Sequence, residues 1–243
     1  HRLLLTNSQE VKSYEEVKKQ WETAGAKETS GVRIEIQAED ATKTSSQMLY
    51  PKQDQSSPMV YPSSARTLLN NTIGGESWSD AGQWIEWEFE VPESGYYHIS
   101  MMDRQRFMRG IYVSRKIYLD GEVPFKELEN YGFVYDSSWR MDVLSDEENI
   151  PYDFYLEQGK HTIRMEVVLG DFSSIISSVQ SCVSQLNAIY RKVIRITGVS
   201  PDTYRDYQIA SSLPGLKQEM TAVRDQLDQA ITDLCAASGR TSD

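Results

Sequence analysis

Residues 82–103 alternate apolar and polar side chains in two successive runs, and this pattern constrains the fold more than any other feature. Four apolar side chains within Ile85–Val91 share one face of the first run, while Trp84 and three glutamates share the other. Alternation with a period of two is typical of an antiparallel strand with one buried face. The turn sequence at 92–95 leads into the second run. We therefore predict a hairpin that places Trp87 in the core.

The same alternation recurs through the middle of the chain without helical segments between the runs. Many strands of this kind predict an antiparallel β-sandwich, or jelly roll. The glutamates at 86, 88 and 90 are expected to form a solvated edge that deters aggregation. The predicted strands are 32–39, 84–91, 95–103, 111–119, 152–156 and 160–169.

The period changes after residue 171. Apolar residues recur at steps of three and four over 172–197, and a near-heptad seam runs from Leu216 to Leu234. Two amphipathic helices joined by one loop are expected to pack as an antiparallel hairpin. Each helix holds one cysteine, Cys182 and Cys235. In an antiparallel hairpin these two cysteines lie about two helical turns apart along the helix axes. We therefore expect buried, free thiols and no disulfide bridge.

The chain therefore divides into three predicted zones, and its class is mainly β with an α appendage. Residues 1–30 form a helical arm that begins at a capping box of Ser13 and Glu16. Residues 31–171 form the sandwich. Residues 172–243 form the hairpin, and we expect the natural polypeptide to continue beyond it.

Charge excludes some partners. The net charge is -11 and the sequence pI is about 4.9. An acidic surface repels polyanions, so nucleic acid is a poor partner, as is an anionic membrane. The sequence has no apolar run near the length of a membrane span, so we expect no direct membrane insertion.

Five segments of the β zone resemble family 6 and family 35 carbohydrate-binding modules, which are jelly rolls attached to extracellular sugar-processing proteins. The resembling segments are Ile36–Ala41, Trp78–Trp87, Val91–Tyr97, Leu119–Gly121 and Leu156–Arg164. A second resemblance is to the N-terminal region of large extracellular solute-binding proteins of Gram-positive bacteria, which belong to ABC importers. It is carried by Leu186–Lys192, Ile196–Gly198 and Pro201–Tyr207.

The first resemblance implies a site in which aromatic rings stack on sugar faces. The candidate rings outside the alternating core are Trp78, Trp139, Tyr50, Tyr61, Tyr131 and Tyr135, of which Trp78, Trp139, Tyr131 and Tyr135 are the predicted ligand contacts. The alternative for each ring is that it plugs an end of the sandwich. Arg109 belongs to a basic cluster, Arg104 to Lys116, that could clamp the carboxylate of a uronic acid. Alternatively, the basic residues form ion pairs with the protein's own acids, including those at 146–148.

The resemblance also implies a structural calcium ion, because such modules hold one at an edge of the sandwich. Gln37 and Glu39 occupy the positions of the acidic pair on the first strand. Calcium prefers several hard oxygen ligands, and a carboxamide is an uncharged one. The alternative is that Gln37 and Glu39 simply face solvent.

The expected function is non-catalytic. The module would bind glycan, or act as a scaffold, in an extracellular, cell-surface solute-binding protein of a Gram-positive bacterium linked to carbohydrate uptake. Its expected partners are an oligosaccharide and a downstream solute-binding domain of the same polypeptide. The alternative is a purely structural protein-interaction domain without sugar affinity. We predict no enzyme, because the sequence shows no nucleophile elbow, zinc-spaced histidine pair or phosphate loop. A hydrolase on a jelly roll is the remaining, weaker option.

Overall fold

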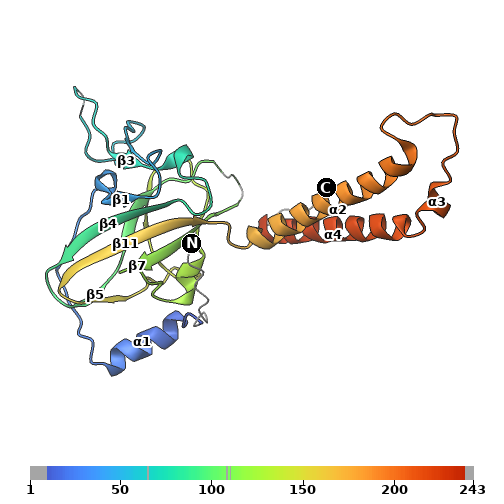
Figure 1. Ribbon diagram of the computed structural model, residues 1–243. Helices are drawn as coiled ribbons and strands as arrows, with labels where there is room; N and C mark the ends of the chain where they lie inside the picture. Colours follow the sequence, from blue (N-terminus) through green and yellow to red (C-terminus); the bar gives the residue numbers. More distant parts are fainter. Residues whose placement is uncertain (1–9, 65, 108, 110, 239–243) are drawn as a thin grey trace, which may run out of the picture. The chain divides into compact units, whose positions relative to one another are not determined.

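The computed structural model describes residues 10–64, 66–107, 109 and 111–238, and the chain divides into two compact units (Figure 1). The first unit extends to Val168 and contains the β zone together with helix α1 (Tyr14–Thr23). The second begins at Leu169 and contains the long helices.

A five-stranded antiparallel sheet forms one layer of the first unit. Its strand order is β1 (Lys43–Thr44), β4 (Trp84–Val91), β11 (Gly159–Val168), β7 (Val113–Leu119) and β8 (Tyr131–Phe133). The long pair β4–β11 runs from Val91 opposite Gly159 to Trp84 opposite Glu166. The alternating runs thus form the central strands, and their apolar faces point to one side.

Shorter strand pairs form the opposing layer. These are β5 (Gly95–Tyr97) with β10 (Phe154–Leu156), and β6 (Ser100–Asp103) with β9 (Arg140–Val143). The core joins both layers, because Ile85, Trp87, Ile117 and Met165 of the large sheet share one buried cluster with Phe154 of β10. Trp87 is 8% exposed, as predicted. The predicted antiparallel sandwich is confirmed.

Small elements connect these strands. The pair β2 (Pro51–Lys52) and β3 (Thr72–Ile73) lies within the long segment that precedes β4. Three 3-10 turns complete the unit: η1 (Ala38–Asp40), η2 (Gly75–Ser77) and η3 (Lys126–Glu129).

Helix α1 packs on the sandwich through its N-terminal residues. Ser13 and Glu16 form the predicted capping box. The Tyr14 ring contacts Phe125 and Tyr152 at centroid distances of 5.0 and 4.7 Å. Aromatic edge contacts of this kind stabilise a packed interface.

The predicted first strand at 32–39 is wrong. Residues 32–37 have no assigned strand, and the chain then enters η1. The carbonyl of Ala38 accepts a hydrogen bond from Trp87 Nε1 at 2.8 Å, which draws this segment onto the core. A tertiary hydrogen bond has therefore prevailed over local alternation.

The predicted solvated glutamate edge is wrong for Glu86, because β4 lies inside the sheet, between β1 and β11, whereas Glu88 and Glu90 are exposed as predicted. Glu86 is 5% exposed and pairs with Lys43 at 3.0 Å and with Arg164 at 2.5 Å. The same guanidinium lies 4.2 Å from the centroid of the Trp84 ring and covers it. The outer face of the sheet therefore carries a partly buried ion-pair network.

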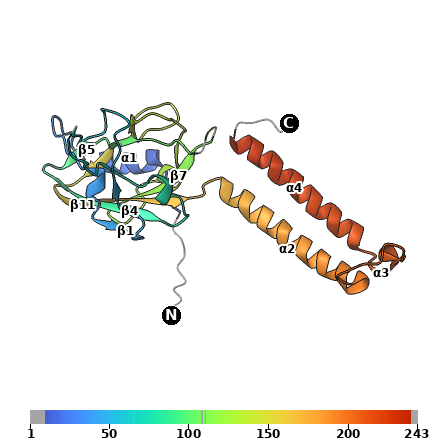
Figure 2. The same cartoon turned by 90° about the horizontal axis from the view of Figure 1, so that it is seen from above.

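The second unit is the predicted antiparallel hairpin. Helices α2 (Phe172–Thr197) and α4 (Leu216–Ser238) lie side by side, joined by a loop that contains α3 (Ile209–Ser212) (Figure 2). Their own small core contains Cys182, Ile189 and Val223. Cys182 is buried, Cys235 is half-buried, and they form no disulfide with each other, as predicted. Among the described residues, no helix is long and apolar enough to cross a bilayer.

Candidate functional site

Strand register gathers several loops at one end of the sandwich. Trp84 pairs with Glu166, Ser114 with Val168, and Val113 with Phe133, so β4 and β7 begin, and β8 and β11 finish, at the same end. The connection from β6 to β7 also lies there. We call this region, formed by the described residues of 45–83, 104–112 and 134–139, the loop end.

Trp139 and Arg104 meet at the loop end. The guanidinium carbon of Arg104 lies 4.7 Å from the centroid of the Trp139 ring. Arg104 also contacts Asp54 Oδ2 at 2.5 Å and donates to Ser56 Oγ at 2.7 Å. These contacts join the 45–71 segment to the loops at 104–112 and 134–139.

The Asp54 carboxylate is held in its charged form. Burial alone would raise the pKa of Asp54, but hydrogen bonds from Ser56 and the charge of Arg104 lower it below its ordinary value. The Arg104 and Asp54 side chains are only 11% and 14% exposed. The ion pair between Arg104 and Asp54 is therefore largely shielded from solvent.

A second group of charges lies directly beside Trp139. Asp103 of β6 pairs with Arg140 of β9, and Arg140 forms a short ion pair with Asp142. Burial, and then the charge of Asp142, raise the pKa of Asp103 to about 7. The group therefore binds a proton at mildly acidic pH.

Three buried polar atoms in this region lack a hydrogen-bond partner among the described residues. They are Asp103 Oδ1, Trp139 Nε1 and Arg140 Nε. They belong to residues that are consecutive or directly paired across β6 and β9. Buried polar groups are normally satisfied, so two donors and one acceptor left over in one place are typical of a site that receives a polar ligand or ordered water.

The other predicted rings have contacts within the protein. Trp78 lies at the loop end, where its Nε1 donates to the Gln83 carbonyl at 3.3 Å and Arg115 covers its ring at 4.4 Å. Burial lowers the pKa of Arg115 to about 10. Tyr131 packs on the core, and its hydroxyl accepts a hydrogen bond from Ser145 N at 3.1 Å. Both rings have the surroundings expected of end plugs.

Tyr135 and Arg109 lie in two loops of the loop end. Tyr135 follows β8 and is half-buried, and Arg109 is exposed in the β6–β7 connection. Two members of the basic cluster pair with the protein's own acids, as predicted, although their partners are not the acids at 146–148. Arg104 pairs with Asp54, and Lys116 lies 3.5 Å from Glu129.

Sequence reasoning missed Asp103, Arg140, Asp142 and Asp54. The available signal was that a charged residue stands at an inward position of an alternating run, as Asp103 does two residues after the core residue Met101. The partners of these residues come from distant parts of the chain and could not be read from spacing.

Gln37 and Glu39 do not share a strand face. Gln37 precedes η1 and Glu39 lies within it, where burial raises the pKa of the Glu39 carboxyl. The described part of the chain contains no group of three or more Asp, Glu, His or Cys side chains arranged to hold a metal. Calcium usually takes six to eight oxygens. The calcium ion stays a prediction.

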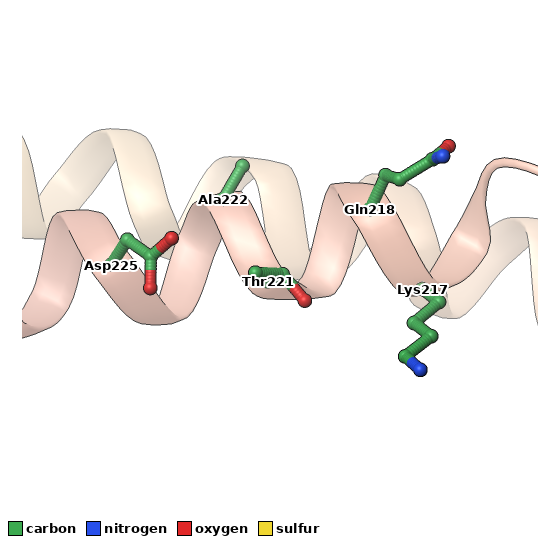
Figure 3. Close-up of a pocket in the computed structure, with 5 residues that line it drawn as sticks. All are labelled: Lys217, Gln218, Thr221, Ala222 and Asp225. Carbon is green, nitrogen blue, oxygen red and sulfur yellow. The ribbon is translucent and has the colours of Figure 1, made fainter.

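A shallow depression lies on helix α4 of the second unit. It is lined by Lys217, Gln218, Thr221, Ala222 and Asp225, all from α4 (Figure 3). Residues of a single helix give it no opposing wall, so it lacks the concave shape of a small-molecule site.

The helical unit matches a known family. Residues 174–243 match the model described as "Bacterial solute-binding protein, 4-helix bundle domain". This match confirms the resemblance of the helical region to bacterial solute-binding proteins. No curated protein matches the sequence significantly.

Several solved structures are similar to the chain at low identity. A cycloisomaltooligosaccharide glucanotransferase of Paenibacillus sp. is 20% identical over 64% of this chain and 21% of its own, with a TM-score of 0.38. A family 35 carbohydrate-binding module of Clostridium thermocellum is 20% identical over 40% of this chain and 66% of its own, with a TM-score of 0.31. A GH26-CBM35 mannanase of Podospora anserina is 12% identical over 56% and 24%, with a TM-score of 0.38.

These similarities cover only part of each protein. The matched region spans about a fifth of the glucanotransferase, two thirds of the carbohydrate-binding module and a quarter of the mannanase. Similarity at this level assigns neither a ligand nor an activity to this chain.

Proposed function

We propose that the sandwich is a non-catalytic glycan-binding module of an extracellular bacterial solute-binding protein, and that it binds an oligosaccharide at the loop end beside Trp139. The observation that carries the proposal is the set of buried, unpartnered polar atoms of Asp103, Trp139 and Arg140. Sugar hydroxyls both donate and accept hydrogen bonds, so they match a mixed set of two donors and one acceptor.

The aromatic ring supplies the apolar half of such a site. Trp139 is half-buried at the loop end, and an indole ring offers a large rigid surface at small entropic cost. Tyr135, Trp78 and Arg109 line the surrounding loops in this proposal. A downstream solute-binding domain of the same polypeptide would receive the captured sugar.

Two histidines lie away from the proposed site. His161 contacts Asp120 at 2.7 Å at the opposite end of the sandwich. His98 contacts Asp153 at 2.9 Å, next to α1.

A structural protein-interaction module is the second candidate. The observation that favours it is the contact of Arg104 with the Trp139 ring, because a guanidinium held by Asp54 occupies part of the surface that a sugar would use. In this case the loop end would be a closed plug, and the sandwich would serve only to join other parts of the polypeptide.

A glycan array followed by calorimetry with the best oligosaccharide separates the two functions. We expect Trp139→Ala to weaken binding at least ~10-fold, which corresponds to one good stacking contact of about 1.4 kcal/mol. Tyr190→Ala is the matched control, because it removes an exposed aromatic ring from the other unit. Absence of binding across diverse glycans, or full binding by Trp139→Ala, would reject the glycan site and favour the interaction module.

A further inference from the structure

The inner face of the β6–β9 pair carries charged side chains at the loop end. Strand register places Asp103 opposite Arg140, and Met101 opposite Asp142. Residues that lie directly opposite each other in an antiparallel pair point to the same side of the sheet. Met101 packs against the core, so the three charged side chains also point into the sandwich, at the end where Trp139 lies.

This group contains two acids and one base, and the base already has a partner. Arg140 forms its ion pair with Asp142. Asp103 shares a hydrogen bond with Asp142. An ionised carboxylate only accepts hydrogen bonds, so a hydrogen bond between two carboxyl groups must contain a proton. Because a buried charge without a counter-charge is costly, Asp103 is the acid that carries this proton.

The other charges around Asp103 do not remove its proton. Burial is the main reason that the pKa of Asp103 is raised to about 7. The negative charges of Asp142 and of Asp136, which lies in the β8–β9 connection, raise this pKa further, and only Arg140 lowers it. Arg104, the next residue in the chain, pairs with a carboxylate of another loop. Asp103 therefore holds its proton at mildly acidic pH and loses it near neutrality.

One oxygen of Asp103, Oδ1, is buried and has no hydrogen-bond partner among the described residues. We propose that the loop-end site exchanges a proton for its ligand: a sugar hydroxyl donates a hydrogen bond to Asp103 Oδ1, and the carboxyl group releases its proton to the solvent. A hydrogen bond to a carboxylate is about twice as strong as one to a neutral acceptor, so the ligand favours the ionised form. This inference rests on the proposed glycan function and adds that pH controls binding at the same site.

The direction of the pH dependence follows from this competition. Protons and ligand favour different forms of Asp103, so the affinity is lowest where Asp103 is protonated and rises as the pH passes through ~7. Hydrogen bonds to neutral and to charged acceptors differ by a factor of about 5–10 in the equilibrium constant. We therefore expect the Kd to be about 5–10-fold lower at pH 8 than at pH 5.

Calorimetry of the full chain between pH 5 and pH 8 tests the proposal. The probe is the neutral oligosaccharide that binds best on the glycan array, because a neutral sugar does not itself titrate in this range. Buffers with different ionisation enthalpies count the protons, and we expect proton release on binding near pH 6.5 and none at pH 8. Asp103→Asn cannot titrate, so its Kd should be the same at every pH. Glu90→Gln is the matched control, because it removes one carboxylate at the opposite end of the sandwich and should keep the wild-type pH profile.

Far-UV circular dichroism at each pH shows whether each variant is folded. If Asp103→Asn does not fold, Asp142→Asn takes its place. It removes the neighbouring negative charge and frees Arg140 for Asp103, so the rise in affinity should move to lower pH. A wild-type Kd that is constant from pH 5 to pH 8, or a pH profile that Asp103→Asn leaves unchanged, would overturn the inference while the glycan function stands. Absence of binding to every glycan on the array would instead reject the function itself, and the inference with it.

Discussion

Replacing Asp103 by Asn tests the electrostatics of the loop end most directly. In the folded protein, burial and the neighbouring Asp142 raise the pKa of Asp103 to about 7. An aspartate in the unfolded chain titrates near its ordinary value of about 3.9. Between these two values the folded state binds a proton that the unfolded state has lost. The contribution of Asp103 to the free energy of unfolding is therefore fully present below pH ~4 and falls as the pH rises through ~7.

The expected size follows from the same difference. Taken at full weight, a rise from 3.8 to about 7 corresponds to ~4 kcal/mol. Asp103 is only partly buried and shares its titration with Asp142, so we expect about 1–2 kcal/mol. Asparagine keeps the shape of the protonated acid and carries no charge. Asp103→Asn should therefore match the wild type below pH ~4 and exceed its stability by about 1–2 kcal/mol at pH 8.

Urea unfolding followed by tryptophan fluorescence provides the assay, because all five tryptophans lie in the first unit and report on the sandwich alone. Comparing variant with wild type at each pH cancels the titration of the remaining groups. Glu147→Gln is the control, since it removes one exposed carboxylate outside the Asp103 group. An Asp103→Asn difference that is constant from pH ~3.5 to 8, or that becomes more destabilising at pH 8, would refute the reasoning.

Two further substitutions probe the core and the outer face of the large sheet. Glu86→Gln should lower the free energy of unfolding by about 2–3 kcal/mol, because it leaves the partly buried Arg164 without its counter-charge; an unchanged urea midpoint would show that solvent screens this network. Phe125→Ala should cost about 3–5 kcal/mol, since Phe125 is 0% exposed and its ring contacts those of Tyr14 and Tyr152. A loss below about 1 kcal/mol in the same assay would mean that the core refills the space.

Elements with a strong local period were predictable from the sequence. Strand β4 and helix α2 have the predicted bounds, 84–91 and 172–197. In both, the spacing of apolar residues fixes which face is buried, and a local signal fixes an end, such as Gly198 in a left-handed conformation after α2. Where a long-range contact decides the backbone, as the Trp87 to Ala38 hydrogen bond does near residue 38, the local pattern gave the wrong element.

The candidate site was predictable only as a set of loops. Alternation placed Trp78, Trp139 and Tyr135 outside the core strands, and strand register then brought their loops to one end. Which ring remains available depends on cations that come from elsewhere in the fold: Arg115 covers Trp78, while Arg104, held by Asp54 from 50 positions earlier, contacts Trp139.

The two cations therefore affect their rings differently. The Arg115 guanidinium, over the Trp78 ring, donates hydrogen bonds to the backbone carbonyls of Ser114 and Trp78 at 3.0 and 3.1 Å. The Arg104 guanidinium is held by the side chains of Asp54 and Ser56, and the glycan proposal requires it to turn from the Trp139 ring toward the ligand. The indole N–H of Trp78 already donates to the Gln83 carbonyl, whereas that of Trp139 is buried without a partner among the described residues, and this difference makes Trp139 the ring on which the glycan proposal depends.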